Sequence, residues 1–141
     1  MKIILDASMA LSWLFERTDP KEGKCANEVL EAVADSETVV PSLWHTEIAN
    51  ALLVGERRKV VTEAQIIDYL NRLDDLPITT DDMVLPGRRN FMMALAREHG
   101  LTAYDATYLD LALRQDAVLA TFDKKLADAM GHAGGIVFKS L

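Results

Sequence analysis

The sequence predicts one α/β domain with a central parallel sheet that is flanked by helices on both faces. Short apolar segments alternate along the chain with longer segments of helical periodicity, and strands separated by helices are typical of a parallel sheet. The length of 141 residues fits one domain, because domains commonly contain about 100–200 residues. No repeat, low-complexity segment or Gly/Ser-rich linker interrupts the sequence, so residues 1–141 are expected to form a single domain.

The first half of the chain contains two of the expected strands. Residues 21–34 repeat apolar side chains at spacings of three and four, which predicts an amphipathic helix. Thr62 followed by Gln65 is a capping-box pattern and indicates a helix that begins there. The helix at residues 8–15 is apolar around much of its circumference, so part of it could face a partner, but core packing is the preferred interpretation for any single residue there. We expect strands at residues 3–5 and 38–40 and helices at residues 8–15, 21–34, 43–58 and 62–74.

The second half continues the alternation. A helix is expected to follow Asp82 and to run to about His99, with Pro86 in its first turn and Gly100 ending it. The remaining expected strands lie at residues 78–80, 117–121 and 136–138, and the remaining helices at residues 104–114 and 124–130.

The composition limits the classes of function. The chain has 15 Lys and Arg against 22 Asp and Glu, a net charge of −7, whereas simple nucleic-acid binders usually show a basic face or a pI above about 9. An acidic total does not exclude a site whose acids hold metal ions. One cysteine, Cys25, suits a reducing cytoplasm. No apolar run reaches the roughly 20 residues of a membrane helix, so we expect a cytoplasmic protein without a membrane partner.

Two acids directly follow predicted strands. Asp6 follows residues 3–5, and Asp123 follows residues 117–121. If these strands are parallel, both side chains lie at the edge of the sheet where α/β proteins bind ligands. Each acid could instead be the N-cap of the next helix, a position that favours Asp.

Two further acids lie on apolar helix faces. Asp105 shares its face with Tyr108, and a buried unpaired carboxylate costs several kcal/mol, so Asp105 requires a partner, a cap role or a metal. Glu47 lies near the start of its helix, where interaction with the helix dipole would contribute only about 0.3–1 kcal/mol. Asp110 faces away from Asp105, and we interpret it as a solvated surface charge paired with Arg114.

The four acids Asp6, Glu47, Asp105 and Asp123 favour a site for a hard divalent cation. Mg²⁺ and Mn²⁺ prefer carboxylate and water oxygens, and such ions activate water in phosphoryl transfer. Zinc is not expected, because the three histidines are dispersed and Cys25 is alone. The sequence contains no glycine-rich dinucleotide or P-loop motif and no Gly-x-Ser-x-Gly elbow.

Four segments resemble the PIN-domain ribonucleases, and more narrowly the VapC-type toxins of toxin–antitoxin pairs. The resemblance spans almost the whole chain, and Tyr-Asp-Ala-x-Tyr-Leu followed by Ala-Thr-x-Asp is its most specific part. The segments are Ile-Leu-Asp-Ala-Ser at 4–8, Thr-Glu-Ile-Ala-Asn-Ala-Leu at 46–52, Leu-Thr-Ala-Tyr-Asp-Ala-Thr-Tyr-Leu at 101–109 and Leu-Ala-Thr-Phe-Asp-Lys-Lys-Leu at 119–126.

The resemblance implies a magnesium-dependent endoribonuclease. It implies that Asp6 and Asp105 are the firmest metal ligands, that Glu47 and Asp123 complete the cluster, and that Thr121 supports it by hydrogen bonding. Members of the family commonly form homodimers and are neutralised by a small antitoxin that also binds DNA. In the mechanism that we expect, metal-activated water attacks the RNA phosphodiester in line.

Basic groups close to the acids are the candidates for substrate contact. Lys124 and Lys125 directly follow Asp123 and are the better phosphate candidates; Arg88 and Arg89 are a second pair. We interpret residues 57–59 as a solvated helix end.

Two alternative functions stay open at this point. A receiver-like phosphoacceptor module also carries clustered acids, but it requires an acidic pair after its first strand, where this chain has one acid. The other alternative is a catalytically inactive PIN-like binding subunit.

Overall fold

A five-stranded parallel sheet lies at the centre of the computed structural model, which describes residues 1–83 and 85–141, with the backbone alone at residue 85. The strand order is β3-β2-β1-β4-β5, and every neighbouring pair is parallel. The strands are β1 Lys2–Leu5, β2 Glu37–Val40, β3 Ile78–Thr80, β4 Val118–Ala120 and β5 Ile136–Val137.

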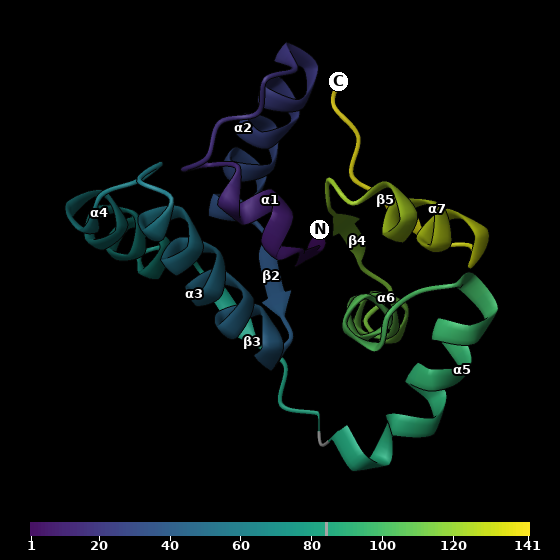
Figure 1. Cartoon of the computed structure of the whole chain (residues 1–141). Coiled ribbons are helices and arrows are strands. Elements are labelled where there is room, and N and C mark those ends of the chain that lie inside the picture. Colours follow the sequence, from purple (N-terminus) through teal and green to yellow (C-terminus); the bar gives the residue numbers. More distant parts are fainter. Residues whose placement is uncertain (84) are drawn as a thin grey trace.

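Helices cover both faces of this sheet, as the sequence predicts. Crossover connections carry the chain outward from β1 through β2 to β3, and then back across the sheet to β4 and β5. Figure 1 shows the result: α2, α3 and α4 lie on one side of the sheet and α5, α6 and α7 on the other. The helices are α1 Ala7–Leu11, α2 Pro20–Asp35, α3 Ser42–Arg57, α4 Glu63–Asp74, α5 Arg89–His99, α6 Ala103–Arg114 and α7 Lys124–His132.

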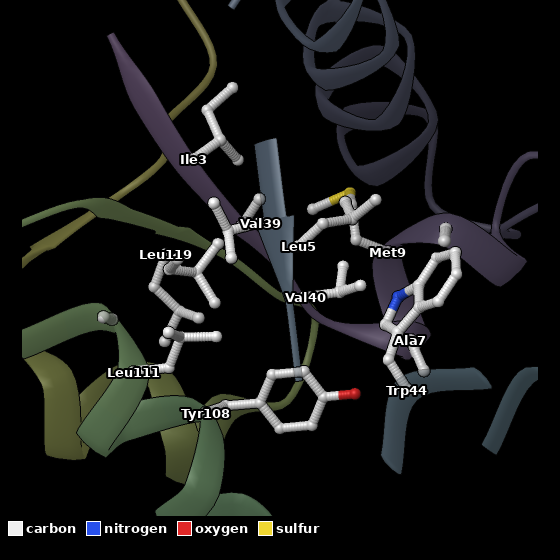
Figure 2. Packing of buried hydrophobic residues seen from close by; sticks show 14 of the residues in the cluster. Ile3, Leu5, Ala7, Met9, Val39, Val40, Trp44, Tyr108, Leu111 and Leu119 are labelled. Atoms are coloured by element: carbon white, nitrogen blue, oxygen red, sulfur yellow. The ribbon is translucent and has the colours of Figure 1, made fainter. Parts of the chain in front are cut away.

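The core forms around the central strands. Ile3, Ile4 and Leu5 of β1 are completely buried, as is Leu119 of β4. A strand that is covered on both faces needs apolar side chains at consecutive positions, so these runs are continuous and do not alternate. Figure 2 shows Leu119 beside Leu111 of α6, and Val40 of β2 between Leu5 and Tyr108.

Local signals fix several helix ends. The hydroxyl of Thr62 accepts a hydrogen bond from the Gln65 backbone N–H (3.2 Å), and the Gln65 side chain accepts one from the Thr62 N–H (2.9 Å). This is the predicted capping box. Gly100 ends α5 with a φ of 65°, a left-handed conformation that glycine adopts without the penalty of a Cβ.

The expected helix between Asp82 and His99 starts later than predicted. Pro86 lies in a short 3₁₀ helix, Leu85–Gly87, and α5 begins only at Arg89. Val84, inside the predicted helix, lies outside the described residues.

The first helix is also shorter than the predicted span of residues 8–15. It ends at Leu11, and the hydroxyl of Ser12 donates to the carbonyl of Met9 (2.5 Å). The Trp13 indole N–H donates to the carbonyl of Ala26 in α2 (3.0 Å), while Phe15 packs against the core. Trp13, Leu14 and Phe15 all pack against the core while staying partly exposed, so core packing accounts for part of the apolar surface beyond Leu11.

The interpretation of Asp110 as a solvated charge is wrong. Asp110 is 2% exposed and accepts hydrogen bonds from Arg114 Nε (3.1 Å) and from the guanidinium of Arg88. Arg114 also donates to Asp81 (2.8 Å). The predicted pair with Arg114 exists, but it lies inside a buried ionic network that joins α6 to the segment after β3. Arg88 is committed to this network and no longer stands out as a substrate contact.

Candidate functional site

The sheet brings the ends of β1 and β4 together. Leu5 is in register with Ala120, and the Asp6 backbone N–H donates to the Ala120 carbonyl (3.0 Å). The strand order reverses between these two strands, and α/β sheets bind ligands at such a switch point. Asp6 and Thr121 therefore leave the sheet side by side.

Two hydroxyl groups hold the Asp6 carboxylate. Asp6 is 6% exposed, and its Oδ2 accepts hydrogen bonds from Ser8 Oγ and Thr121 Oγ1, both at 2.6 Å. Burial raises the pKa of Asp6; the two hydroxyl donors lower it, and the negative charge of Asp123 raises it further. Asp6 occupies the N-cap position of α1, but its side chain makes no capping hydrogen bond, so a capping role does not explain its carboxylate.

The same two hydroxyls are oriented by the loop after β4. Ser8 Oγ accepts from the Phe122 backbone N–H (3.1 Å), and Thr121 Oγ1 accepts from the Asp123 N–H (2.9 Å). Each hydroxyl must therefore point its proton toward Asp6. Ser8 is a site residue that the sequence did not predict; the available signal was a small hydroxyl residue two positions after a strand-end acid.

Asp123 caps the N-terminus of α7 and also lies at the edge of the sheet, after β4. Its Oδ1 accepts a hydrogen bond from the Leu126 N–H (3.0 Å) at the start of α7. The N-cap alternative is confirmed for Asp123. The cap occupies one oxygen, and the charge of this carboxylate still acts on Asp6 and Asp105.

Glu47 reaches the same region from α3. Its Oε1 accepts a hydrogen bond from the Tyr108 hydroxyl (2.5 Å). Burial raises the pKa of Glu47; the bond from Tyr108 lowers it, and the charges of Asp6 and Asp105 raise it. Tyr108 was predicted only as part of the apolar face of α6, although a buried tyrosine usually requires a partner for its hydroxyl.

Asp105 lies in the first turn of α6 and is half-buried. Its backbone N–H donates to Thr102 Oγ1 (3.1 Å), the N-cap of the helix. Burial raises the pKa of Asp105, the charges of Asp123 and Asp6 raise it further, and Thr102 and Lys125 lower it. The pKa of this carboxyl thus responds to both strand-end acids.

The four predicted acids share one edge of the sheet without forming a closed cage. Within the described residues, no three Asp, Glu, His or Cys side chains are close enough to be a ready-made metal site. In the same part of the chain, the four carboxylates form no ion pair with Lys, Arg or His. Carboxylates that repel one another and lack paired cations fit a hard cation such as Mg²⁺, which takes oxygen ligands and keeps several waters.

The two predicted lysines differ in their surroundings. Lys125 lowers the pKa of Asp105, and its ammonium would lie 3.9 Å from a Cβ placed on Gly100. Both lysines are exposed, and Lys124 is not among the charges that act on Asp105. Of the two, Lys125 is therefore the lysine whose charge acts on the acids.

The sequence profile of the PIN domain family matches residues 3–131. The chain belongs to the PIN-domain family. This PIN domain is 30% identical over 132 residues to Ribonuclease VapC3 of Pyrobaculum aerophilum, an alignment that covers 91% of this chain and 94% of the relative. The predicted resemblance to VapC-type PIN domains is confirmed.

Solved structures share the fold of this PIN domain. PAE2754 from Pyrobaculum aerophilum has a TM-score of 0.69 at 22% identity, covering 98% of this chain and 84% of that chain. FitAcB from Neisseria gonorrhoeae has a TM-score of 0.64 at 18% identity, covering 98% of this chain and 97% of that chain. A third structure, of FitAB bound to an IR36 DNA fragment, has a TM-score of 0.61 at 18% identity and covers 98% and 94% of the two chains.

None of the helices in the described part of this PIN domain is both long and apolar enough to cross a membrane.

Proposed function

We propose that this PIN domain is a magnesium-dependent endoribonuclease and the toxin of a toxin–antitoxin pair. The observation that carries the proposal is the convergence of Asp6, Glu47, Asp105 and Asp123 at the switch point of the sheet, where the charges of Asp6, Asp105 and Asp123 raise the pKa values of neighbouring acids. A relative with 30% identity carries the name of a ribonuclease, which supports RNA as the substrate.

Each group in the site has a proposed role. Asp6 and Asp105 hold the ion, and Glu47 and Asp123 complete its binding site. Thr121 orients Asp6 through its hydroxyl. The chemistry that bound Mg²⁺, or Mn²⁺ in its place, supplies is activation of water and stabilisation of charge at the phosphodiester.

Substrate binding is proposed for the lysines that follow Asp123. Lys125 lies near Asp105, so an RNA phosphate held by its ammonium would sit beside the acids. Lys124 is the second candidate and would contact phosphate farther from them.

The proposed partners are a second copy of the chain and a small antitoxin. Both come from the resemblance to VapC-type proteins, and the fold shared with FitAB, a complex that was solved on DNA, agrees with a partner that contacts DNA. The single cysteine agrees with action in the reducing cytoplasm. Co-purification of the chain with the product of a small adjacent reading frame would test the antitoxin.

Cleavage of total RNA with Mg²⁺ tests the proposed activity. The wild-type protein should produce mapped cuts that EDTA abolishes, while Asp6→Asn and Asp105→Asn should lose cleavage by at least about a hundredfold and keep the fold. Asp128→Asn is the matched control, since Asp128 is an exposed acid on α7 away from the strand ends.

The outcomes separate the alternatives. Metal-dependent cleavage that persists in both site variants would contradict the assignment of the acids. Labelling of the chain by a small phosphodonor, without RNA cleavage, would favour the receiver-like module. RNA binding without any cleavage would favour an inactive PIN-like subunit.

A further inference from the structure

Tyr108 is a polar residue at a fully buried position. It is 0% exposed and is among the largest side chains enclosed in the core. Figure 2 shows its ring extending from α6 past Val40, with the hydroxyl turned away from α6. That hydroxyl donates to Glu47 Oε1 at 2.5 Å, across 61 positions of sequence. A phenylalanine would fill the same volume, so packing alone does not explain the oxygen atom.

The place of Tyr108 on α6 connects two acids. Tyr108 follows Asp105 by three positions, and residues at this spacing lie on one helix face. Asp105 therefore reaches the edge of the sheet from the first turn of α6, and Tyr108 reaches Glu47 from the next turn. In this way α6 supplies one acid and holds another that belongs to α3.

Glu47 is the acid that most needs such a contact. Its side chain is half-buried and lies on the sixth residue of α3, not directly behind a strand. Free rotamers of a long side chain would have to be ordered when a ligand binds, at an entropic cost. The hydrogen bond from Tyr108 holds Oε1 of Glu47 in place. The other carboxylate oxygen, Oε2, does not receive this bond.

Protein donors also hold a carboxylate oxygen of Asp6 and of Asp123. Ser8 and Thr121 both donate to Oδ2 of Asp6, and the Leu126 N–H donates to Oδ1 of Asp123. These donors hold Oδ2 of Asp6 and Oδ1 of Asp123, as Tyr108 holds Oε1 of Glu47. Such outer contacts orient ligands, and their loss typically weakens metal affinity about 10–100-fold.

We infer that Tyr108 is a positioning residue, which holds Glu47 so that one carboxylate oxygen is presented to a divalent cation at the Asp6–Asp105 edge. The inference rests on the proposed function, because it concerns the same acidic site. It assigns a role in metal binding to a residue that touches neither the ion nor the RNA.

Tyr69 provides a matched control. It is also buried, 7% exposed, and its hydroxyl donates to the backbone carbonyl of Ala10 at 2.6 Å. Tyr69→Phe and Tyr108→Phe each delete one buried hydroxyl group. Only Tyr108 is bonded to a carboxylate, so a difference between the variants in metal affinity reports on Glu47.

Direct titration with Mn²⁺ by calorimetry tests the inference on the purified full chain. Tyr108→Phe should weaken Mn²⁺ binding about tenfold, while Tyr69→Phe should bind as the wild type does. Both variants should show a similar fall in thermal unfolding temperature. In a Glu47→Gln background, adding Tyr108→Phe should cause no further loss of affinity, because its effect acts through the Glu47 carboxylate.

Each failure has a distinct meaning. Wild-type affinity in Tyr108→Phe, or an equal loss in Tyr69→Phe, would overturn the inference and leave the proposed function in place. An undiminished effect of Tyr108→Phe in the Glu47→Gln background would also overturn it. Absence of Mn²⁺ binding by the wild-type chain would overturn the proposed function together with the inference.

Discussion

Among single residues, Asp6 occupies the most enclosed position of the four acids. It is buried, whereas Glu47, Asp105 and Asp123 are each partly exposed. Two hydroxyl donors compensate part of the desolvation of its carboxylate, but the net direction is a raised pKa. When the pKa of a carboxyl group is higher in the folded than in the unfolded state, ionisation of that group lowers the free energy of unfolding. Asp6 thus lowers stability near neutral pH and supplies a carboxylate to the proposed metal-binding edge.

Asp6→Asn should therefore stabilise the metal-free protein near neutral pH. Below the ordinary Asp pKa of 3.8, both the folded and the unfolded wild-type chains are protonated, and the carboxyl causes no pH-dependent loss. As pH rises above 3.8, the unfolded chain ionises first, so wild-type stability falls until the pH passes the raised pKa of the folded state. Asn cannot ionise. In EDTA at about pH 7, Asp6→Asn should therefore unfold at a higher urea concentration than the wild type.

Urea unfolding at several pH values measures this difference. The advantage of Asp6→Asn should shrink toward about pH 3 and should be offset by added Mg²⁺, which stabilises only a protein that binds it. A variant that is less stable than the wild type at every pH would contradict the proposed burial cost.

At the scale of elements, two helices carry the same local pair in opposite surroundings. Asp68 and Arg72 in α4 form an i,i+4 ion pair with side chains 64% and 80% exposed. Asp110 and Arg114 in α6 form the same pair with side chains 3% and 18% exposed. Local spacing predicts both pairs equally well. Only the packing of α6 against its neighbours decides which pair is buried.

Asp110→Asn should cost about 3–5 kcal/mol of stability, because it removes the buried carboxylate shared by Arg88 and Arg114. Asp81 then remains as a counter-charge for Arg114. Asp68→Asn is the matched control and should cost about 0.5 kcal/mol or less. Urea unfolding of both variants provides the comparison. Equal losses would show that burial does not control the contribution of these pairs.

For the whole molecule, the acidity belongs largely to the proposed site. The net charge is −7, and the four acids at the switch point account for more than half of it. The rest of the surface is therefore only mildly acidic, and it does not attract RNA by itself. Binding of RNA should depend on a cation at the acids and on a few local basic groups.

A non-cleavable single-stranded RNA analogue should bind weakly in EDTA and at least about tenfold more tightly with Mg²⁺, because the cation neutralises the acidic edge. Lys125→Ala should weaken binding in Mg²⁺ more than Lys124→Ala, since Lys125 is the lysine that acts on Asp105. Fluorescence anisotropy measures all four conditions. Equal RNA affinity with and without Mg²⁺ would contradict the idea that RNA binding depends on a cation at the acidic edge.

The sequence by itself determined the order of strands and helices and the strand-end places of Asp6 and Asp123. These features are local, since apolar runs, caps and the residue after a strand are fixed by near neighbours in the chain. The apolar helix faces around Glu47 and Asp105 added these two acids as predicted site residues, and the family motif added Thr121. Where the sequence signals for a helix end were weaker, as at the end of α1 and the start of α5, the observed helix boundary differs from the predicted one by several residues.

Only the tertiary structure decided which polar groups meet. The hydrogen bond from Tyr108 to Glu47 joins residues 61 positions apart, and Thr121 meets Asp6 across 115 positions. Asp110 belongs to a buried ionic network because Arg88, at the start of α5, donates hydrogen bonds to its carboxylate. Such contacts depend on how elements pack across the sheet, and the spacing of residues along one helix or strand holds no information about them.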